Sequence, residues 1–262
     1  MQETTTKKAS LANQSSEKLL SLIEVLSVQD GPIRLSDLAA LLNMNASTVS
    51  RFLTTLQNRG YVTMDSDTGK YSMTYKICQL ANNLTSRMDL RNICRPYLHK
   101  VSKLFDCTTN LITRYGYSVI YLEVVPGPQQ FLVPLQRIGK VAPLYCTGAG
   151  KIFLQEFSDQ EMEDYASDVN FERFTEHTLC SIEELKRAVA VAAENGYAID
   201  NEECEIGTRC LAVPIYDYTG HVHAAISINA PASKLTDDYI LQNADILKNI
   251  ANEISHCIGY SE

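Results

Sequence analysis

The sequence predicts an α+β protein: a winged helix-turn-helix at the N-terminus, then a linker helix, then an antiparallel sheet with flanking helices. Three observations lead to this prediction. Apolar residues recur at helical spacing through most of the first 60 residues. Two short alternating segments, separated by turn residues, follow at 61–73. From Thr108 onward the apolar pattern changes to strands interspersed with helices.

Three segments before residue 60 have the apolar spacing of amphipathic helices. In the first, over 16–28, the residues at i, i+3, i+4 and i+7 are Leu19, Leu22, Ile23 and Leu26. Ser36 is expected to cap a second helix, because a serine oxygen accepts from the free N–H groups of the first turn. Asn45 or Ser47 is expected to cap a third helix, which Gly60 ends.

A hairpin is predicted after the third helix. Residues 61–64 alternate as a strand, 65–69 (DSDTG) are typical turn residues, and 70–73 return as the partner strand. Three short helices followed by a hairpin make a winged helix-turn-helix.

The outward side of the third helix carries small hydrogen-bonding side chains and one arginine, without an acid. A helix that enters the major groove needs this profile, because phosphates repel carboxylates and arginine reads guanine bidentately. Lys70 on the hairpin can contact the DNA backbone. The predicted contacts to double-stranded operator DNA are therefore Ser47, Thr48, Ser50, Arg51, Thr54, Thr55 and Lys70. The alternative is a winged helix that serves only protein contacts or dimerisation.

The net charge of −8 is unusual for a DNA-binding protein. Residues 1–75 carry seven Lys or Arg and seven Asp or Glu, so the acidic excess lies in the rest of the chain. A neutral DNA-binding module must depend on a few well-placed cations, on helix N-termini and on the doubled contacts of a dimer.

The composition argues against several other classes of protein. The eight cysteines include no C-x-x-C pair, so reduced thiols are expected rather than a metal site, and no cofactor is expected. His221 and His223 alternate on a strand-like segment and are expected to face solvent. No apolar segment approaches the roughly 18 residues of a membrane span. Without a secretory signal, the expected location is the cytoplasm.

Four segments are expected along the chain: a flexible tail over 1–14, the winged helix-turn-helix over 15–74, a linker helix over 75–90 and the sheet domain over 91–262. Pro96 is expected in the first turn of a helix that ends at Phe105. That helix carries dimer contacts or packs on its own domain. Strands are predicted at 110–113, 119–124, 131–135, 211–215 and 224–229, and later helices at 148–157, 181–196 and 237–258.

Two longer segments carry a resemblance to a known family. They are PLYCTGAGKIFL, from Pro143 to Leu154, and GYAIDNEECEIGTRCLAVPIYDYTGHVHAAISINAP, from Gly196 to Pro231. These segments, and the order of winged helix, linker helix and sheet domain, resemble the IclR family of bacterial transcriptional regulators. The resemblance covers nearly the whole chain after the first dozen residues. It implies a GAF-like C-terminal domain that binds a small, usually carboxylate-bearing metabolite.

Matching the family's motifs onto this sequence implies a ligand-binding set of Gly148, Ala149, Asp200, Cys210, Ser227 and Asn229. The chemistry of these residues agrees, since free N–H groups at a helix start suit a carboxylate. Ser227 and Asn229 lie two apart on a strand and so share a face. Asn229 stands where the family often has serine, and Thr208 where it is often apolar, so a polar keto-acid or sugar acid is the expected effector.

The expected function is that of an effector-controlled transcriptional regulator, a repressor, that acts as a homodimer or a dimer of dimers. The alternative is an enzyme that uses a winged helix for dimerisation. The sequence contains no G-x-G-x-x-G and no P-loop. A hydrolytic trio of Cys210, His221 and Asp200 is conceivable, but no sequence feature brings a histidine beside the thiol.

Overall fold

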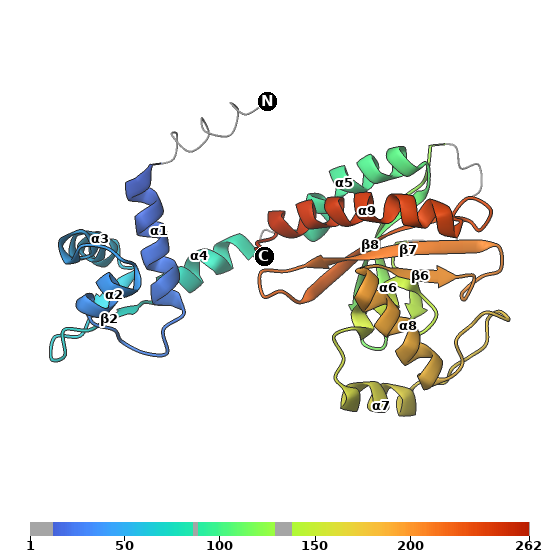
Figure 1. Cartoon of the computed structure of the whole chain (residues 1–262), viewed down its shortest axis with the longest axis horizontal. Helices are drawn as coiled ribbons and strands as arrows, with labels where there is room; N and C mark the ends of the chain where they lie inside the picture. Colours follow the sequence, from blue (N-terminus) through green and yellow to red (C-terminus); the bar gives the residue numbers. More distant parts are fainter. Residues whose placement is uncertain (1–12, 86–88, 129–137, 262) are drawn as a thin grey trace. The chain divides into compact units, whose positions relative to one another are not determined.

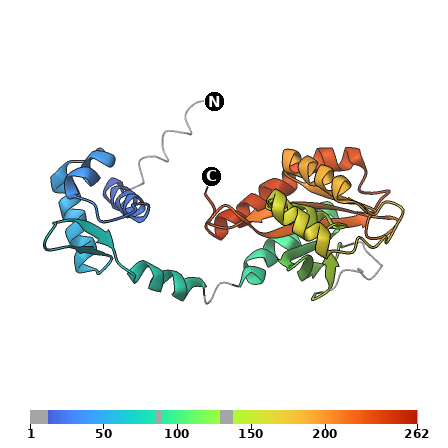
Figure 2. The same cartoon turned by 90° about the horizontal axis from the view of Figure 1, so that it is seen from below.

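The chain divides into two units, Met1–Met88 and Asp89–Glu262, and each is described by itself. The computed structural model describes residues 13–85, 89–128 and 138–261. No helix in these ranges is long and apolar enough to cross a membrane. Figure 1 and Figure 2 show the elements of each unit in two views.

The N-terminal unit is a winged helix-turn-helix, as the sequence predicts. Its elements are α1 (Gln14–Ser27), α2 (Leu35–Leu41), α3 (Ala46–Asn58), β1 (Val62–Met64), β2 (Tyr71–Met73) and α4 (Lys76–Thr85). The helices and the hairpin enclose one core, formed by Leu22, Leu26, Leu38, Ala39, Val49, Leu53, Leu56 and Val62. All of them except Val62, which lies on β1, are residues that helical spacing turns inward. The left-handed backbone of Gly60, with φ of 75°, follows the end of α3.

The expected Ser36 cap is wrong. Helix α2 begins two residues earlier than a Ser36 cap implies, directly after Arg34, and the Ser36 hydroxyl instead donates to the Asp37 side chain over 3.0 Å. The reason lies just before the helix, where Ile33 and Tyr71 exchange two backbone hydrogen bonds of 2.9 and 2.8 Å. This bridge holds the chain extended up to Arg34, so the helix starts directly after it.

The C-terminal unit is built on one antiparallel sheet of six strands in the order β5-β4-β3-β8-β7-β6. The strands are β3 (Thr108–Tyr115), β4 (Ser118–Val125), β5 (Val141–Pro143), β6 (Ala198–Asn201), β7 (Thr208–Tyr216) and β8 (Val222–Pro231). The helices are α5 (Leu90–Phe105), α6 (Gly148–Leu154), α7 (Asp159–Asp168), α8 (Ile182–Asn195) and α9 (Asp237–Cys257).

The sheet separates two hydrophobic cores. Helices α5 and α9 cover one face, where Phe105 and Leu247 pack against strand residues such as Ile226. Helices α6, α7 and α8 cover the other face, where Ile152 and Tyr165 are buried. The predicted α+β fold is confirmed. Because α6 lies against β6, β7 and β8, its first turn faces the sheet residues that the motifs single out.

Several elements of this unit were missed, differ from the prediction or cannot be compared with it. The strand expected at 131–135 lies outside the described residues. Strands β5 and β6 and helix α7 were not predicted. Pro96 lies in the second turn of α5, because Asp89 caps the helix by accepting from the Arg91 N–H over 3.0 Å and so starts it at Leu90.

Candidate functional site

The exposed side of α3 is the candidate DNA interface. Ser47, Ser50, Arg51, Thr54 and Thr55 are exposed and Thr48 is half-buried. Opposite them, the buried side chains of the same helix face the core. Within the described part of the chain, Arg51 forms no ion pair, so its guanidinium is available to a ligand. The helix therefore presents hydrogen-bonding groups and one cation, with no acid of its own.

Two threonines on this surface are hydrogen-bonded within the helix. The Thr54 hydroxyl donates to the Ser50 carbonyl over 2.9 Å, and the Thr55 hydroxyl donates to the Arg51 carbonyl over 3.0 Å. Such bonds leave each hydroxyl oxygen able to accept but use its proton. Without rearrangement, these two side chains can accept from bases but cannot donate to phosphates.

The wing turn contains acids that serve its own structure. Asp65 accepts from the N–H groups of Asp67 and Thr68, at 3.1 and 2.7 Å, and from the Thr68 hydroxyl at 2.8 Å. These bonds, the hydroxyl first, hold the pKa of Asp65 below its usual value. Lys70, half-buried at the end of this turn, directly precedes the wing strand β2.

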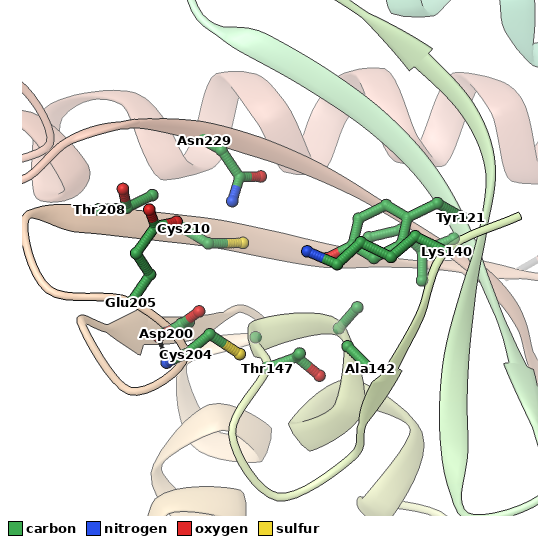
Figure 3. A pocket seen from close by; sticks show the side chains of 13 residues that line it. Tyr121, Lys140, Ala142, Thr147, Asp200, Cys204, Glu205, Thr208, Cys210 and Asn229 are labelled. Carbon is green, nitrogen blue, oxygen red and sulfur yellow. Dashed lines mark hydrogen bonds between the residues drawn. The ribbon is translucent and has the colours of Figure 1, made fainter. Parts of the chain in front are cut away.

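A cavity of about 70 Å³ lies in the C-terminal unit between the first turn of α6 and the sheet. One water needs roughly 10–15 Å³ of such volume, so the cavity holds several non-hydrogen atoms. Its lining combines polar and apolar side chains (Figure 3). The lining residues are Ile112, Tyr121, Lys140, Ala142, Thr147, Gly148, Ala149, Asp200, Cys204, Glu205, Thr208, Cys210 and Asn229.

Strand register brings three of the expected ligand-binding residues side by side. Asp200 on β6 pairs with Cys210 on β7, which in turn pairs with Asn229 on β8. Directly paired residues of antiparallel strands place their side chains next to each other on one face. These three side chains therefore form a continuous row across the sheet beneath the cavity, although up to 29 residues separate them in sequence.

Ser227 lies beside this row rather than on the cavity wall. It is fully buried, and its hydroxyl oxygen accepts from the Asn110 amide over 3.0 Å. The same Asn110 NH₂ group donates to Asn229 Oδ1 over 2.7 Å. Because its oxygen is engaged in this way, Asn229 turns its NH₂ group toward the cavity (Figure 3). Ser227 and Asn110 thus hold Asn229 in a defined orientation.

The first turn of α6 supplies backbone N–H groups. Thr147 caps the helix: its side chain accepts from the Gly150 N–H over 3.0 Å and donates to the Pro143 carbonyl over 3.1 Å. The N–H groups of Gly148 and Ala149 belong to the first turn, which has no intrahelical acceptors. A Cβ on Gly148 would lie 3.3 Å from the Ala198 carbonyl oxygen, so glycine allows the helix to approach β6 closely.

A buried ion pair supports the loop after β6. Lys151 Nζ lies 2.5 Å from Glu203 Oε1 and donates to the Ile199 carbonyl over 2.6 Å. Asp200 Oδ1 accepts from the Glu203 N–H over 2.7 Å. Burial, and then the charge of Glu203, raise the pKa of Asp200 to about 7. Near neutral pH this carboxyl is therefore substantially protonated and does not carry the full charge that would repel an acid.

The cavity lacks the arrangement of a hydrolytic enzyme. Burial raises the pKa of the Cys210 thiol to about 12, so the thiolate nucleophile is scarce at neutral pH. His221 follows β7 at the end opposite Cys210 and hydrogen-bonds Glu156, with Nδ1 3.3 Å from Oε1. No cluster of three or more metal-ligating side chains exists among the described residues. The groups present favour reversible binding of a polar molecule.

Several cavity residues were not singled out in the sequence. Tyr121 on β4 and Lys140 before β5 lie opposite the row, and Figure 3 shows the Lys140 nitrogen pointing into the cavity. Cys204 and Glu205 come from the loop after β6. Alternation on β4 was a signal for Tyr121, but the loop residues have no local pattern. Their place depends on contacts between distant segments.

Comparisons with known proteins cover both units. A model of the IclR helix-turn-helix domain matches residues 15–66, and a model of the bacterial transcriptional regulator IclR C-terminal domain matches residues 82–256. Together they span α1, α2, α3 and β1 of the N-terminal unit and nearly all of the sheet unit.

Individual relatives agree with the two models. The transcriptional regulator KdgR of Escherichia coli is 31% identical, over 94% of this chain and 92% of its own. The transcriptional repressor AllR of Salmonella typhimurium is 29% identical, over 94% of this chain and 90% of its own. The crystal structure of Thermotoga maritima IclR superposes with a TM-score of 0.62 at 30% identity, and covers 94% of this chain and 99% of that one.

Proposed function

Because this chain belongs to the IclR family of DNA-binding bacterial transcriptional regulators, we propose that it is a repressor controlled by a small carboxylate metabolite bound in the C-terminal cavity. The observation that carries this proposal is the row of Asp200, Cys210 and Asn229, which faces the first turn of α6 across an enclosed space. The cavity is the site of the effector, and α3 is the site of the operator.

The effector carboxylate lies at the α6 end of the cavity. Backbone N–H groups at Gly148 and Ala149 attract an anion, and the Lys140 ammonium adds a positive charge. The Asn229 amide and the Thr208 hydroxyl bind keto or hydroxyl oxygens at the opposite wall. With its raised pKa, Asp200 contributes a neutral hydrogen-bonding carboxyl below pH about 7.

The volume of the cavity favours a compact acid. At roughly 10–15 Å³ for each water-sized group, about 70 Å³ suits a keto-acid of a few carbons better than a larger sugar acid. The polar character contributed by Asn229 and Thr208 suits either class.

Operator binding rests on Ser47, Thr48, Ser50, Arg51, Thr54 and Thr55 of α3, with Lys70 at the wing. In this proposal the chain has four segments: a tail over 1–14, the winged helix-turn-helix over 15–74, the linker over 75–90 and the effector domain over 91–262. A dimer places two α3 helices at two half-sites, and a dimer of dimers extends this to four. Such a regulator acts in the cytoplasm, where the chromosome is.

The experiment that tests the proposal is a thermal-shift screen of the purified full-length protein with pyruvate, other keto-acids, gluconate and benzoate. A ligand that binds only the folded protein raises Tm by mass action. We expect one of the small acids to raise Tm, and Asn229→Ala to remove most of this rise. A rise that Asn229→Ala leaves intact places the effector elsewhere and contradicts the proposed site.

A further inference from the structure

Two free cysteine side chains meet at the wall of the cavity. Cys204, in the loop after β6, has its Sγ 3.3 Å from the Sγ of Cys146, and its thiol also donates to the Cys146 carbonyl over 2.9 Å. The two residues are 58 positions apart in sequence, so the fold and not local chain geometry brings them together.

We propose that Cys146 and Cys204 form a reversible disulfide when the protein meets a peroxide, and that this pair is a redox modification site of the effector cavity. The Cys204 sulfur attacks one peroxide oxygen, the O–O bond breaks, and a sulfenic acid and one water form. The Cys146 sulfur then attacks the Cys204 sulfur and releases a second water. Two thiols lose two hydrogens in total, and the peroxide is reduced to two waters.

The geometry suits this reaction. A disulfide needs an S–S distance of about 2.05 Å, so the two sulfurs, now 3.3 Å apart, must approach by roughly 1.2 Å. Cys204 is half-buried and lines the cavity, whereas Cys146 is buried behind it. Peroxide that enters the cavity therefore reaches Cys204 first, and Cys146 is placed as the resolving thiol.

The surroundings of Cys204 also affect the rate at which peroxide oxidises it. The hydrogen bond to Cys146, and then burial, hold the pKa of Cys204 above its usual value. Since the thiolate is the reactive form, oxidation is slow and requires sustained peroxide rather than a trace.

The bond would connect the two walls of the cavity. Cys146 directly precedes Thr147, the cap of α6, and the Cys204 N–H lies 3.4 Å from Asp200 Oδ1. A disulfide here restrains the first turn of α6 against the loop after β6, whose N–H groups donate to Asp200. Its effect on the effector rests on the proposed function, whereas formation of the bond does not.

The test uses the full-length protein, treated with hydrogen peroxide, alkylated with iodoacetamide and digested with trypsin without a reductant. The sequence places Cys146, Cys204 and Cys210 in separate tryptic peptides, 141–151, 188–209 and 210–234. We expect a linked 141–151/188–209 species, two hydrogens lighter than the sum of its peptides, which dithiothreitol separates.

Cys204→Ser should abolish this species, and Cys210→Ser, a change in the same cavity, should retain it. The proposal is overturned when peroxide oxidises the exposed Cys78 and Cys257 while both cavity peptides are recovered alkylated.

A second measurement separates the bond from the proposed function. The thermal shift produced by the active carboxylate is compared in reduced protein and in protein shown to be linked. If the thermal shift is lost when the disulfide forms and returns with dithiothreitol, the result supports both the effect of the disulfide and the proposed effector site. A linked protein with an undiminished shift overturns the role of the bond at the effector site, although the modification itself has then been observed.

Discussion

Lys151 on α6 and Glu203 in the loop after β6 form an ion pair inside the C-terminal unit, with 4% and 6% of their side chains exposed. The pair joins the two segments that enclose the cavity. It thereby fixes the distance between the first turn of α6 and Asp200.

Removal of one partner leaves the other charge buried. We expect Lys151→Met to lower the free energy of unfolding by about 3–5 kcal/mol, as for other broken buried pairs. Lys186→Met is the matched control, because Lys186 pairs with Glu163 at the surface, where such a pair contributes ~0–1 kcal/mol. Urea unfolding measures both. Equal losses in the two variants would show that the buried pair does not stabilise the fold.

Asp200 predicts a pH dependence of stability. Its pKa rises from 3.8 to about 7 on folding, so between these values the folded protein binds more protons than the unfolded chain. The free energy of unfolding therefore falls as pH rises through this window, by up to roughly 1.4 kcal/mol per pH unit from this group. Asp200→Asn should flatten that part of the urea-unfolding profile. A profile with an unchanged slope in the variant would mean that Asp200 titrates normally.

Addition of a side chain at Gly150 is expected to destabilise the C-terminal unit through a steric clash. A Cβ at this position would lie 2.0 Å from the Leu144 carbonyl oxygen, and a backbone atom cannot move away cheaply. We expect Gly150→Ala to cost about 3 kcal/mol or more in the unfolding of the C-terminal unit. Gly31→Ala, where a Cβ meets nothing within 4 Å, should change thermal unfolding little. Comparable behaviour of both variants would rule out the close contact between α6 and the segment before it.

Replacement of Arg51 is expected to lower operator affinity without unfolding the protein. We expect Arg51→Ala to weaken binding by roughly 10- to 100-fold, since a bidentate contact to guanine is worth ~1–3 kcal/mol. Lys18→Ala removes one exposed charge from α1 and should cost much less. Fluorescence anisotropy at fixed salt, with a duplex selected by the wild-type protein, compares the two. Losses of equal size would leave only a general charge effect and no specific role for α3.

The parts of the fold with strong local signals were predicted. The core face of α3 follows from helical spacing, and the hairpin follows from alternation and the turn at 65–69. Helix α7 was missed because only Met162 and Tyr165 of its residues are buried, so its apolar signal is weak. Its capping box, Ser158 with Glu161, was the available signal. Strands β5 and β6 have three and four residues, too few to display a period.

The residues of the candidate site likewise fall into those that could be predicted from the sequence and those that could not. Gly148, Asp200, Cys210 and Asn229 stand out by resemblance. Strand register brings the last three together, and the packing of α6 against the sheet adds Gly148. Cys204 could not be placed from the sequence, because its contact with Cys146 depends on the packing of α6 against the sheet. Asn110 is similar: its bond to Asn229 depends on the pairing of β3 with β8.

We propose that an acid bound in the cavity controls operator affinity. The most direct measurement is the operator affinity of the wild-type protein and of Ser227→Ala/Asn229→Ala, with and without the carboxylate that raises Tm. Without the acid, we predict equal operator affinities for the two proteins. At saturating acid, the operator affinity of the wild type should fall by about tenfold or more, as expected for a coupling of ~1–3 kcal/mol. The operator affinity of the double variant should change little. If the double variant loses operator affinity as fully as the wild type at the same acid concentration, the acid does not act through this cavity.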